Sequence, residues 1–218
     1  MRAVIVANGD AVSADRTVAA TADLLIAADG GALLCSRWGL LPQLVVGDLD
    51  SLGASHAEDL ARRGARVVAH PPEKDESDTE LAVRLALERG AQEIVLLAAL
   101  GGGRLDHAIA NILLIAGPQL GGRVRAVRGG TTVRALHGGG TLALDGSAGD
   151  LVTLLPIGDA HGVVTEGLRY PLNDSPLVAG AARGLSNVIE RTPASVAIGG
   201  GVLLVFEIAA DTADGGHS

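Results

Sequence analysis

The first half of the chain alternates between short, wholly apolar runs and longer segments that are apolar on one face only. The short runs predict strands buried on both faces, and the longer segments predict amphipathic helices. Strands are expected at residues 4–7, 24–28, 44–46, 67–69, 94–98 and 124–127, and helices at 15–22, 32–38, 55–63, 77–89 and around 109–113. This alternation is typical of an α/β fold with an open, mainly parallel sheet that carries helices on both faces.

Local signals mark several helix ends. Ser55 and Ser77 each precede a glutamate by three residues, which is the spacing of a capping box, and both are expected to begin helices. Gly39, Gly64 and Gly90 follow helical segments and are expected to end them. The last helix of this half is expected to pack through one apolar face, formed by Ile109, Ile112 and Leu113.

The pattern changes near Gly129. Beyond it we find no strong helix, only short apolar runs cut by Gly, Asp, Asn and Pro, at residues 141–144, 151–155, 163–165, 195–198 and 202–206. Such runs predict a β-sandwich, and the three glycines at 199–201 predict a hairpin turn. We therefore expect an α/β domain at residues 1–128 and an all-β sandwich domain at 129–218. The small, polar tail at 211–218 is expected to be disordered.

Composition narrows the classes of partner. The chain has 48% hydrophobic residues, a net charge of −8 and only three aromatic residues, so a nucleic-acid partner is not expected. A single cysteine, Cys35, excludes an internal disulfide and fits a reducing compartment. Residues 1–7 are expected to form a strand and not a signal segment, and no apolar run is long enough for a bilayer. We expect a soluble cytoplasmic protein with no membrane partner.

Acidic side chains follow four successive strands of the expected sheet. In an open parallel sheet, ligands bind beyond the carboxyl ends of the strands, so these side chains are expected to gather at one edge. The residues are Asp29 after the second strand, Asp48 and Asp50 after the third, Asp75 and Asp78 after the fourth, and Asp106 after the fifth, with Lys74 and Arg104 as cations among them. Asp48 and Asp50 are two positions apart, so in an extended strand they would point to the same side.

Carboxylates gathered at one edge repel each other unless a cation lies between them, and hard oxygen ligands suit Mg²⁺. A magnesium–polyphosphate complex would supply that positive charge. The glycines at 30–31 and 102–103 would allow backbone amides to approach phosphate oxygens, and helix N-termini also favour anions. The sequence therefore predicts a metal-assisted phosphate site.

Each of these motifs also has a simpler structural explanation. The acidic and glycine pairs are ordinary turn formers, Asp78 can serve the helix dipole, and Arg104 with Asp106 can form a surface ion pair. His107 is expected to be structural and Cys35 to lie in the core, and the scattered histidines give no support for zinc. These simpler explanations do not account for the recurrence of acidic groups at four successive strand ends.

Taken in order, these motifs resemble those of bacterial thiamine pyrophosphokinases. The segments that carry the resemblance are DGGA at 29–32, GDLDS at 47–51, KDESDTE at 74–80, GGRLDH at 102–107, TEGLRYPL at 165–172 and GLSN at 184–187. Two positions depart from the pattern: Val188 stands where many relatives have glutamate, and the tryptophan that some relatives carry near the C-terminal end is missing.

The resemblance implies an α/β domain that binds ATP and Mg²⁺, a β-sandwich domain that binds thiamine, and a homodimer with active sites between its subunits. It implies transfer of the terminal diphosphate of ATP to the hydroxyethyl oxygen of thiamine, which gives thiamine diphosphate and AMP. The implied catalytic residues are Asp48, Asp50, Asp78, Arg104 and Asp106, and the implied metal ligands are Asp48, Asp50, Asp75 and Asp78. The implied substrate-binding residues are Asp29, Gly30, Gly31, Lys74, Asp75, Thr79, Gly102 and Gly103, with Ser186 and Asn187 for thiamine.

Two other functions remain possible from the residues alone. A phosphohydrolase could use an aspartate of the loop at 48–50 as its nucleophile, although such enzymes usually place that loop after the first strand. A non-enzymatic sensor of a nucleotide or of thiamine is the second alternative. The sequence does not identify which carboxylate accepts the hydroxyl proton.

Overall fold

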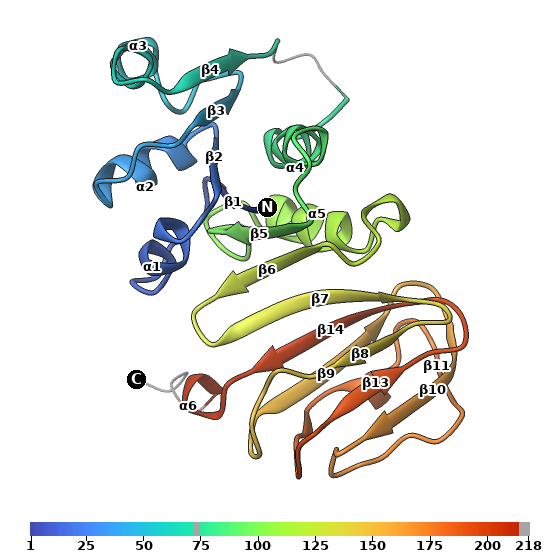
Figure 1. The fold of residues 1–218 in the computed structure, drawn as a ribbon. Coiled ribbons are helices and arrows are strands. Elements are labelled where there is room, and N and C mark those ends of the chain that lie inside the picture. Colours follow the sequence, from blue (N-terminus) through green and yellow to red (C-terminus); the bar gives the residue numbers. More distant parts are fainter. Residues whose placement is uncertain (72–74, 214–218) are drawn as a thin grey trace. The chain divides into compact units, whose positions relative to one another are not determined.

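The computed structural model describes residues 1–71 and 75–213 and divides the chain into two compact units (Figure 1). Unit 1 comprises Met1–Leu114 and Ala126–Gly129, and unit 2 comprises Ile115–Arg125 and the chain from Gly130 onward. Lys74 and the tail beyond residue 213 lie outside the described residues, and Asp211 falls in a short helix, α6 (Ala210–Ala213).

Strands and helices alternate through the first unit. The elements are β1 (Arg2–Val6), α1 (Asp15–Ala20), β2 (Leu24–Ala28), α2 (Gly31–Arg37), β3 (Leu44–Gly47), α3 (Ala54–Arg62), β4 (Arg66–Ala69), α4 (Asp78–Glu88), β5 (Glu93–Leu97), α5 (Leu105–Ile115), a 3₁₀ turn (Pro118–Leu120) and β6 (Val124–Arg128). Each strand expected from the apolar runs of this half is present, with ends shifted by two residues or fewer.

The strands of unit 1 form a parallel sheet in the order β5-β1-β2-β3-β4. The chain builds outward from β1 to β4 and then returns through α4 to place β5 on the other side of β1. The strand order therefore reverses between β1 and β5. In open α/β sheets, a reversal of this kind opens a crevice at the carboxyl ends of the two strands.

Helices cover both faces of this sheet, as the unbroken apolar strands predict. Alternate strand residues such as Val4, Val6 and Leu25 share one buried cluster with residues of α1, α2 and α3, including Cys35. The intervening residues, such as Ile5, are equally buried, and α4 contacts β1, β2 and β3 (Figure 1). Cys35 is fully buried, which confirms it as a core residue, and this burial raises the pKa of its thiol to about 12.

The helix ends agree with the glycine signals but not with both capping boxes. Gly39, Gly64 and Gly90 follow α2, α3 and α4 with positive φ, as expected of glycines that end helices. Ser77 is the N-cap of α4 and accepts a hydrogen bond from the amide of Glu80 at 3.2 Å. The capping box at Ser55 is wrong, because α3 begins one residue earlier and its N-cap, Gly53, makes no side-chain bond.

The expected packing face of α5 is also wrong. Ile109 and Leu113 are each 49% exposed, whereas Ala108, Asn111 and Ile115 are buried. The buried face is anchored by a polar group, since Asn111 Nδ2 donates to the carbonyl oxygen of Ala99 at 3.1 Å. Because this buried face carries Ala108 and Ile115 beside the polar Asn111, its apolar signal in the sequence is weaker than that of Ile109, Ile112 and Leu113.

The second unit contains two antiparallel sheets. Its elements are β7 (Thr131–His137), β8 (Thr141–Ala143), β9 (Leu151–Pro156), β10 (Ala160–Glu166), β11 (Ser175–Leu177), a 3₁₀ turn (Ala182–Gly184), β12 (Asn187–Val188), β13 (Ser195–Ala197) and β14 (Val202–Ile208). One sheet has the order β12-β9-β14-β7, and the other has the order β11-β10-β13-β8.

The two sheets of unit 2 share a single core. Val152 and Leu203 from the first sheet lie in the same buried cluster as Val163 and Val196 from the second, so the unit is a β-sandwich, as expected. The glycine run at 199–201 does not form the expected hairpin. It carries the chain from β13 in one sheet to β14 in the other, and these two strands do not pair.

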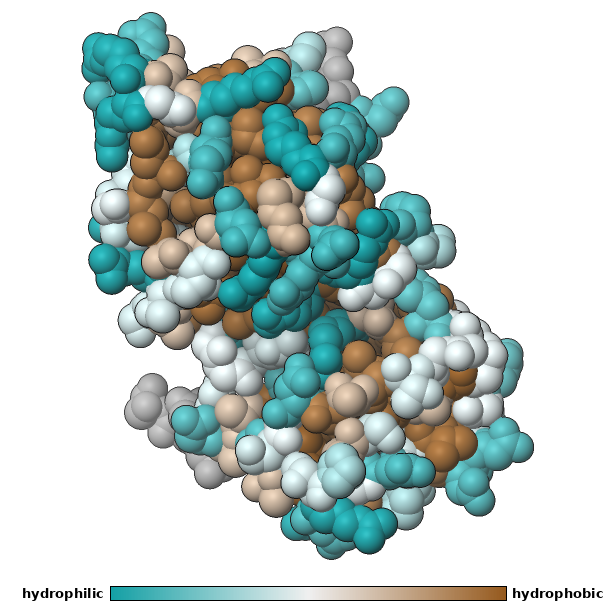
Figure 2. All heavy atoms as spheres, viewed as in Figure 1, coloured by the Kyte–Doolittle hydropathy of each residue, from teal (hydrophilic) through white to brown (hydrophobic). Residues whose placement is uncertain are grey.

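Polar residues cover much of the visible face of each unit, with apolar residues showing between them (Figure 2). Among the described residues, every helix is too short or too polar to span a bilayer.

A buried ion pair ties together three segments of unit 2. Glu207 on β14 is 7% exposed and bonds Arg134 on β7. Its Oε2 atom also accepts hydrogen bonds from the backbone amides of Asp145 at 2.7 Å and Gly146 at 3.0 Å. Asp145 pairs with the same arginine at 3.1 Å, but its own side chain is 81% exposed.

Replacing Glu207 with alanine is expected to destabilise the protein by roughly 3–5 kcal/mol, because the substitution leaves the largely buried guanidinium of Arg134 with only the exposed Asp145 as an acidic partner and removes the acceptor of two backbone amides. Asp145→Asn is the matched control, since it removes an exposed partner of the same arginine and should cost less than about 1 kcal/mol. Urea unfolding of both variants measures the difference. Equal losses would mean that the burial of Glu207 does not determine its contribution.

Candidate functional site

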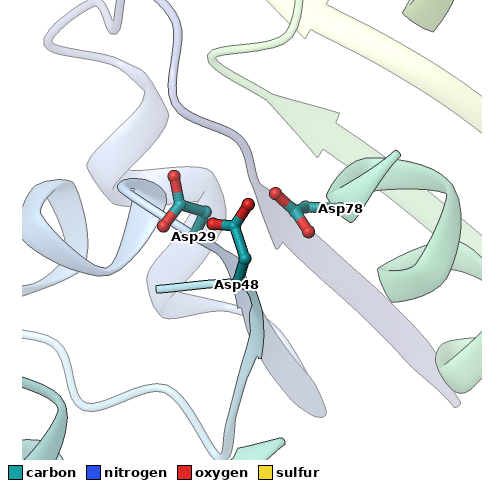
Figure 3. Close-up of side chains that lie close together, drawn as sticks. All are labelled: Asp29, Asp48 and Asp78. Carbon is teal, nitrogen blue, oxygen red and sulfur yellow. The ribbon is translucent and has the colours of Figure 1, made fainter. Parts of the chain in front are cut away.

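The carboxyl edge of the first sheet brings together three aspartates from three different segments. Asp29 follows β2, Asp48 follows β3, and Asp78 is the first residue of α4. Each offers a carboxylate oxygen, and these oxygen atoms all lie within 4.8 Å of one another. Figure 3 shows the three side chains lying close together.

The backbone holds the first two of these aspartates in place. Asp29 donates its amide to the carbonyl oxygen of Val46 at 2.8 Å, which locks it to β3, and it adopts a positive φ of 43°. Asp48 Oδ1 accepts a hydrogen bond from the amide of Asp50 at 3.2 Å. Positive φ at a non-glycine residue costs of order 1–3 kcal/mol and persists only where the surrounding structure imposes it. The position of Asp29 is therefore fixed by the fold.

Gly47 forms the floor of this cluster. A Cβ atom at this position would lie 3.1 Å from Asp29 Cβ and 3.1 Å from both Cγ and Oδ1 of Asp78. Its φ of +144° is also a value that residues with side chains rarely adopt. The glycine thus lets two carboxylates approach across the end of β3.

The structure brings Asp29 into the group and leaves Asp50 and Asp75 outside it. The expected convergence of Asp48 and Asp50 is wrong because the segment is not extended. β3 ends at Gly47, and Leu49 has a φ of +65°, so the two side chains do not share a direction. Asp50 Oδ1 instead accepts a hydrogen bond from Ser51 Oγ at 3.1 Å.

The cluster fits a divalent cation. Asp29 is 7% exposed, and its Oδ1 atom is buried without a hydrogen-bond donor from the described part of the chain. A buried carboxylate oxygen without a partner, beside two like charges, is costly unless a cation binds it. Octahedral Mg²⁺ with bonds of about 2.1 Å holds its ligand atoms about 3–4 Å apart, so small side-chain rotations would close this cluster around it.

The glycine pair at 30–31 is explained by close packing as well as by a turn. A Cβ atom at Gly31 would lie 2.0 Å from the carbonyl oxygen of Val6, and one at Gly30 would lie 2.3 Å from Asn8 Oδ1. Side chains at either position would push α2 away from β1. The pair therefore determines where Asp29, the preceding residue, stands.

Arg104 and Asp106 pair with each other at the start of α5. Arg104 donates from Nε to Oδ1 of Asp106 at 2.9 Å and from Nη2 to Oδ2 at 2.6 Å. The hydrogen bond from Arg104 lowers the pKa of Asp106 to about 2, and the same bond raises the pKa of Arg104. Both side chains are exposed, which matches the surface ion pair considered from the sequence.

The other expected site residues of unit 1 differ in exposure and in their contacts. Thr79 is buried next to Asp78, and Asp75 is exposed. Gly102 has a φ of +106° and donates its amide to Asp10 Oδ2 at 3.1 Å, while nothing would obstruct a Cβ atom at Gly103. Lys74 lies outside the described residues.

In unit 2, Asn187 has a structural role that the sequence did not indicate. Its Oδ1 accepts from the amide of Tyr170 at 3.0 Å, and its Nδ2 donates to the carbonyl oxygen of Tyr170 at 2.7 Å. Asn187 is 8% exposed, whereas Tyr170 is 63% exposed. The asparagine therefore fixes the backbone beneath an exposed aromatic ring. Ser186 is exposed and has a φ of +56°.

Comparisons with known proteins point to one family. The family model described as "Thiamin pyrophosphokinase, catalytic domain" matches residues 16–121, and that described as "Thiamin pyrophosphokinase, vitamin B1 binding domain" matches residues 141–203. Together these segments make up well over half of the chain. The thiamine pyrophosphokinase of Bacillus subtilis (strain 168) is 24% identical over 185 residues, which cover 84% of this chain and 86% of that protein.

Solved structures share the fold. The crystal structure of thiamine pyrophosphokinase from Bacillus subtilis aligns with a TM-score of 0.84 at 23% identity, covering 96% of this chain and 99% of that one. A thiamin pyrophosphokinase family protein from Enterococcus faecalis gives 0.83 at 24% identity, with 95% and 99% covered. The thiamin pyrophosphokinase from Candida albicans gives 0.77 at 16% identity, with 95% and 89% covered.

Replacing Gly47 with alanine is expected to weaken divalent-metal binding at the cluster at least tenfold, because the added Cβ would displace the carboxylates of Asp29 and Asp78. Backbone strain should also lower stability by roughly 1–3 kcal/mol. Titration with Mn²⁺, followed by the electron paramagnetic resonance signal of the free ion, measures the affinity.

Gly53→Ala is the matched control, since its φ of +79° imposes similar strain but a Cβ atom there would meet nothing within 4 Å. Its stability should fall and its Mn²⁺ affinity should not change. Equal affinity losses in both variants would show that the effect on metal binding comes from global destabilisation.

Proposed function

The chain belongs to the thiamine pyrophosphokinase family, and on that basis we propose that it transfers the terminal diphosphate of ATP to the hydroxyethyl oxygen of thiamine. The products are thiamine diphosphate and AMP. The family match favours this transferase activity over the phosphohydrolase and the sensor considered from the sequence. The two proposed domains have separate roles. Residues 1–128 are proposed to bind ATP and metal, and residues 129–218 are proposed to bind thiamine.

The observation that carries this proposal is the cluster of Asp29, Asp48 and Asp78 at the carboxyl edge of the sheet. These three residues would hold Mg²⁺, and the bound ion would neutralise charge on the diphosphate group. Asp29 supplies the oxygen that has no other partner among the described residues, so it joins the proposed ligands beside Asp48 and Asp78. Asp50 and Asp75 remain proposed ligands on the strength of the motif match alone.

Phosphoryl transfer depends mainly on how the attacking oxygen and the leaving oxygen are positioned. The thiamine hydroxyl oxygen attacks the β-phosphorus in line with the bond to the leaving AMP oxygen. Arg104, next to the glycine turn at 101–103, is proposed to release Asp106 and bind the transferring phosphates. The pair is exposed, so its separation costs little. Lys74, Thr79, Gly102 and Gly103 are proposed as further phosphate contacts.

In unit 2 we propose that Ser186 contacts thiamine and that Asn187 acts as a positioning residue. The Asn187 amide already bonds both the amide and the carbonyl oxygen of Tyr170. Tyr170 presents an exposed aromatic ring in a chain that lacks the C-terminal tryptophan of some relatives. A ring of this kind is suited to a cationic heteroaromatic substrate.

Replacing Asp29 or Asp48 with asparagine is expected to lower kcat by at least three orders of magnitude, because losing metal-bridged stabilisation of the transition state costs several kcal/mol. Release of AMP from ATP and thiamine at saturating Mg²⁺ measures the rate. Asp59→Asn is the control, since Asp59 pairs with arginines of α3 and its C-cap and should leave kcat unchanged. Near-normal turnover in the Asp29 and Asp48 variants would remove the metal assignment.

We also propose a homodimer in which the carboxylate cluster of one chain and the thiamine-binding segment of its partner form each active site. An Asp48→Asn chain co-refolded with a Ser186→Leu chain should then recover activity. Each heterodimer would hold one site with both lesions and one with neither, so it should approach half of the wild-type rate. Absence of recovery in heterodimers isolated by two affinity tags would mean that each site is built within one chain.

A further inference from the structure

The loop after β5, residues 98–102, lies against the loop after β1, residues 8–10. Gly9 donates its amide to the carbonyl oxygen of Ala98 at 2.9 Å, and a Cβ atom on Gly9 would lie 2.4 Å from the carbonyl oxygens of both Ala98 and Gly101. Ala98 has a φ of +51°, a conformation that persists only where the surrounding structure imposes it. The two loops therefore meet through their backbones, without room for a side chain at Gly9.

Side chains from α5 and β6 hold the middle of the loop after β5. Asn111, on the buried face of α5, donates from Nδ2 to the carbonyl oxygen of Ala99 at 3.1 Å. Arg128, the last residue of β6, donates from Nη1 to the carbonyl oxygen of Leu100 at 2.8 Å. A Cβ atom on Gly101 would lie 2.6 Å from the same Nη1 atom, so the guanidinium lies over this glycine. Two elements that come later in the chain therefore fix this stretch of backbone.

Asp10, in the loop after β1, holds the end of the same loop. Its Oδ2 accepts the amide of Gly102 at 3.1 Å and lies 3.6 Å from Nη2 of Arg128. The side chains of Asp10 and Arg128 are 61% and 41% exposed, so their ion pair contributes little to the stability of the fold. Glycine can take several backbone conformations, and Gly102 has a φ of +106°. The bond to Asp10 therefore selects one conformation of a turn that is intrinsically flexible.

Arg104 follows this turn after one further residue. Its carbonyl oxygen accepts a backbone amide of the first turn of α5 at 3.2 Å. The backbone of Arg104 is thus held on one side by α5 and on the other by the bond between Gly102 and Asp10. Gly103 is exposed, and a Cβ atom there would meet nothing within 4 Å, so the space around the turn is open. Arg104 can therefore leave Asp106 by rotation of its side chain alone.

We propose that Asp10 is a positioning residue for the diphosphate transfer. It acts through the amide of Gly102, which determines where the backbone of Arg104 stands, and it does not itself contact the substrates. This role rests on the proposed function, in which Arg104 binds the transferring phosphates. A misplacement of about 1 Å at a reacting centre can cost roughly 100-fold in rate, so a weak, exposed contact can affect turnover far more than stability.

Asp10→Ala should lower kcat about tenfold or more, while the KM for thiamine stays within about twofold of the wild-type value. The melting temperature should fall by no more than about 4 °C, because the lost contacts are exposed. Asp10→Asn keeps an oxygen acceptor for the amide of Gly102 and should retain kcat within about threefold of the wild type. An equal loss of kcat in Asp10→Asn and Asp10→Ala would overturn the proposal.

Asp23→Ala is the matched control. Asp23 is also exposed, and its Oδ2 accepts the backbone amide of Arg2 at 2.7 Å, where β1 and β2 begin. This substitution removes the same kind of bond at the opposite edge of the sheet and should leave kcat unchanged. Equal losses of kcat in Asp10→Ala and Asp23→Ala would mean that the effect is not specific to the loop after β5, and the positioning role would be wrong.

The Arg104→Ala protein provides a sharper test, because in it a positioning residue has no guanidinium left to position. Adding Asp10→Ala to Arg104→Ala should lower kcat by less than about twofold further. Losses that multiply would show that Asp10 acts independently of Arg104 and would overturn the proposal. A normal kcat in the Arg104→Ala protein would overturn it as well.

The proton NMR signal of the Gly102 amide reports on the contact without turnover. In the full-length protein this signal should move upfield in Asp10→Ala, because the amide no longer donates to a carboxylate, and it should keep its position in Asp23→Ala. An unchanged signal in an active enzyme would overturn the positioning role alone. The expected shift in a protein that releases no AMP from ATP and thiamine would instead contradict the proposed function, and the positioning role with it.

Discussion

The first unit must hold three like-charged carboxylates close together against their mutual repulsion. A parallel sheet buried on both faces leaves only its edges for polar groups, and the carboxyl edge places Asp29, Asp48 and Asp78 within 4.8 Å. The fold maintains this arrangement through the bond from Asp29 to Val46 and through the missing side chain at Gly47. The stability of the packed sheet thus holds like charges together, and a bound cation would relieve the strain.

The loops beside the carboxylate cluster are also held in place by the fold. Strand order reverses between β1 and β5, and the loops after these two strands bond each other through Gly9, Ala98, Gly102 and Asp10. The side chain of Asn8, in the loop after β1, packs against Gly30, which follows Asp29 in the chain.

Much of the fold could be predicted from the sequence because unbroken apolar strands allow few alternatives. The sequence did not predict β7, because this strand contains the polar residues Thr131, Thr132 and Arg134. Its strand conformation is explained by its pairing with β14. The glycine run at 199–201 gave the wrong connection, since glycine indicates a turn but not which sheet the next strand joins. These errors concern long-range pairing, which local pattern does not contain.

The sequence predicted that aspartates form the candidate site, but it did not predict which of them lie together. The sequence led to the acidic edge, and the left-handed backbone of Leu49 then separated Asp50 from Asp48 in a way that no period-2 rule allows. The role of Asn187 was missed because its partners are backbone atoms of Tyr170, 17 residues away.

Anomalous diffraction from a crystal grown with Mn²⁺ and a non-hydrolysable ATP analogue tests the central claim most directly. The account predicts a manganese peak next to carboxylate oxygens of Asp29, Asp48 and Asp78. This peak should lie between the sheet edge on one side and the β- and γ-phosphates on the other. A peak coordinated by Asp50 and Asp75 without Asp29, or by Asp106, would contradict it.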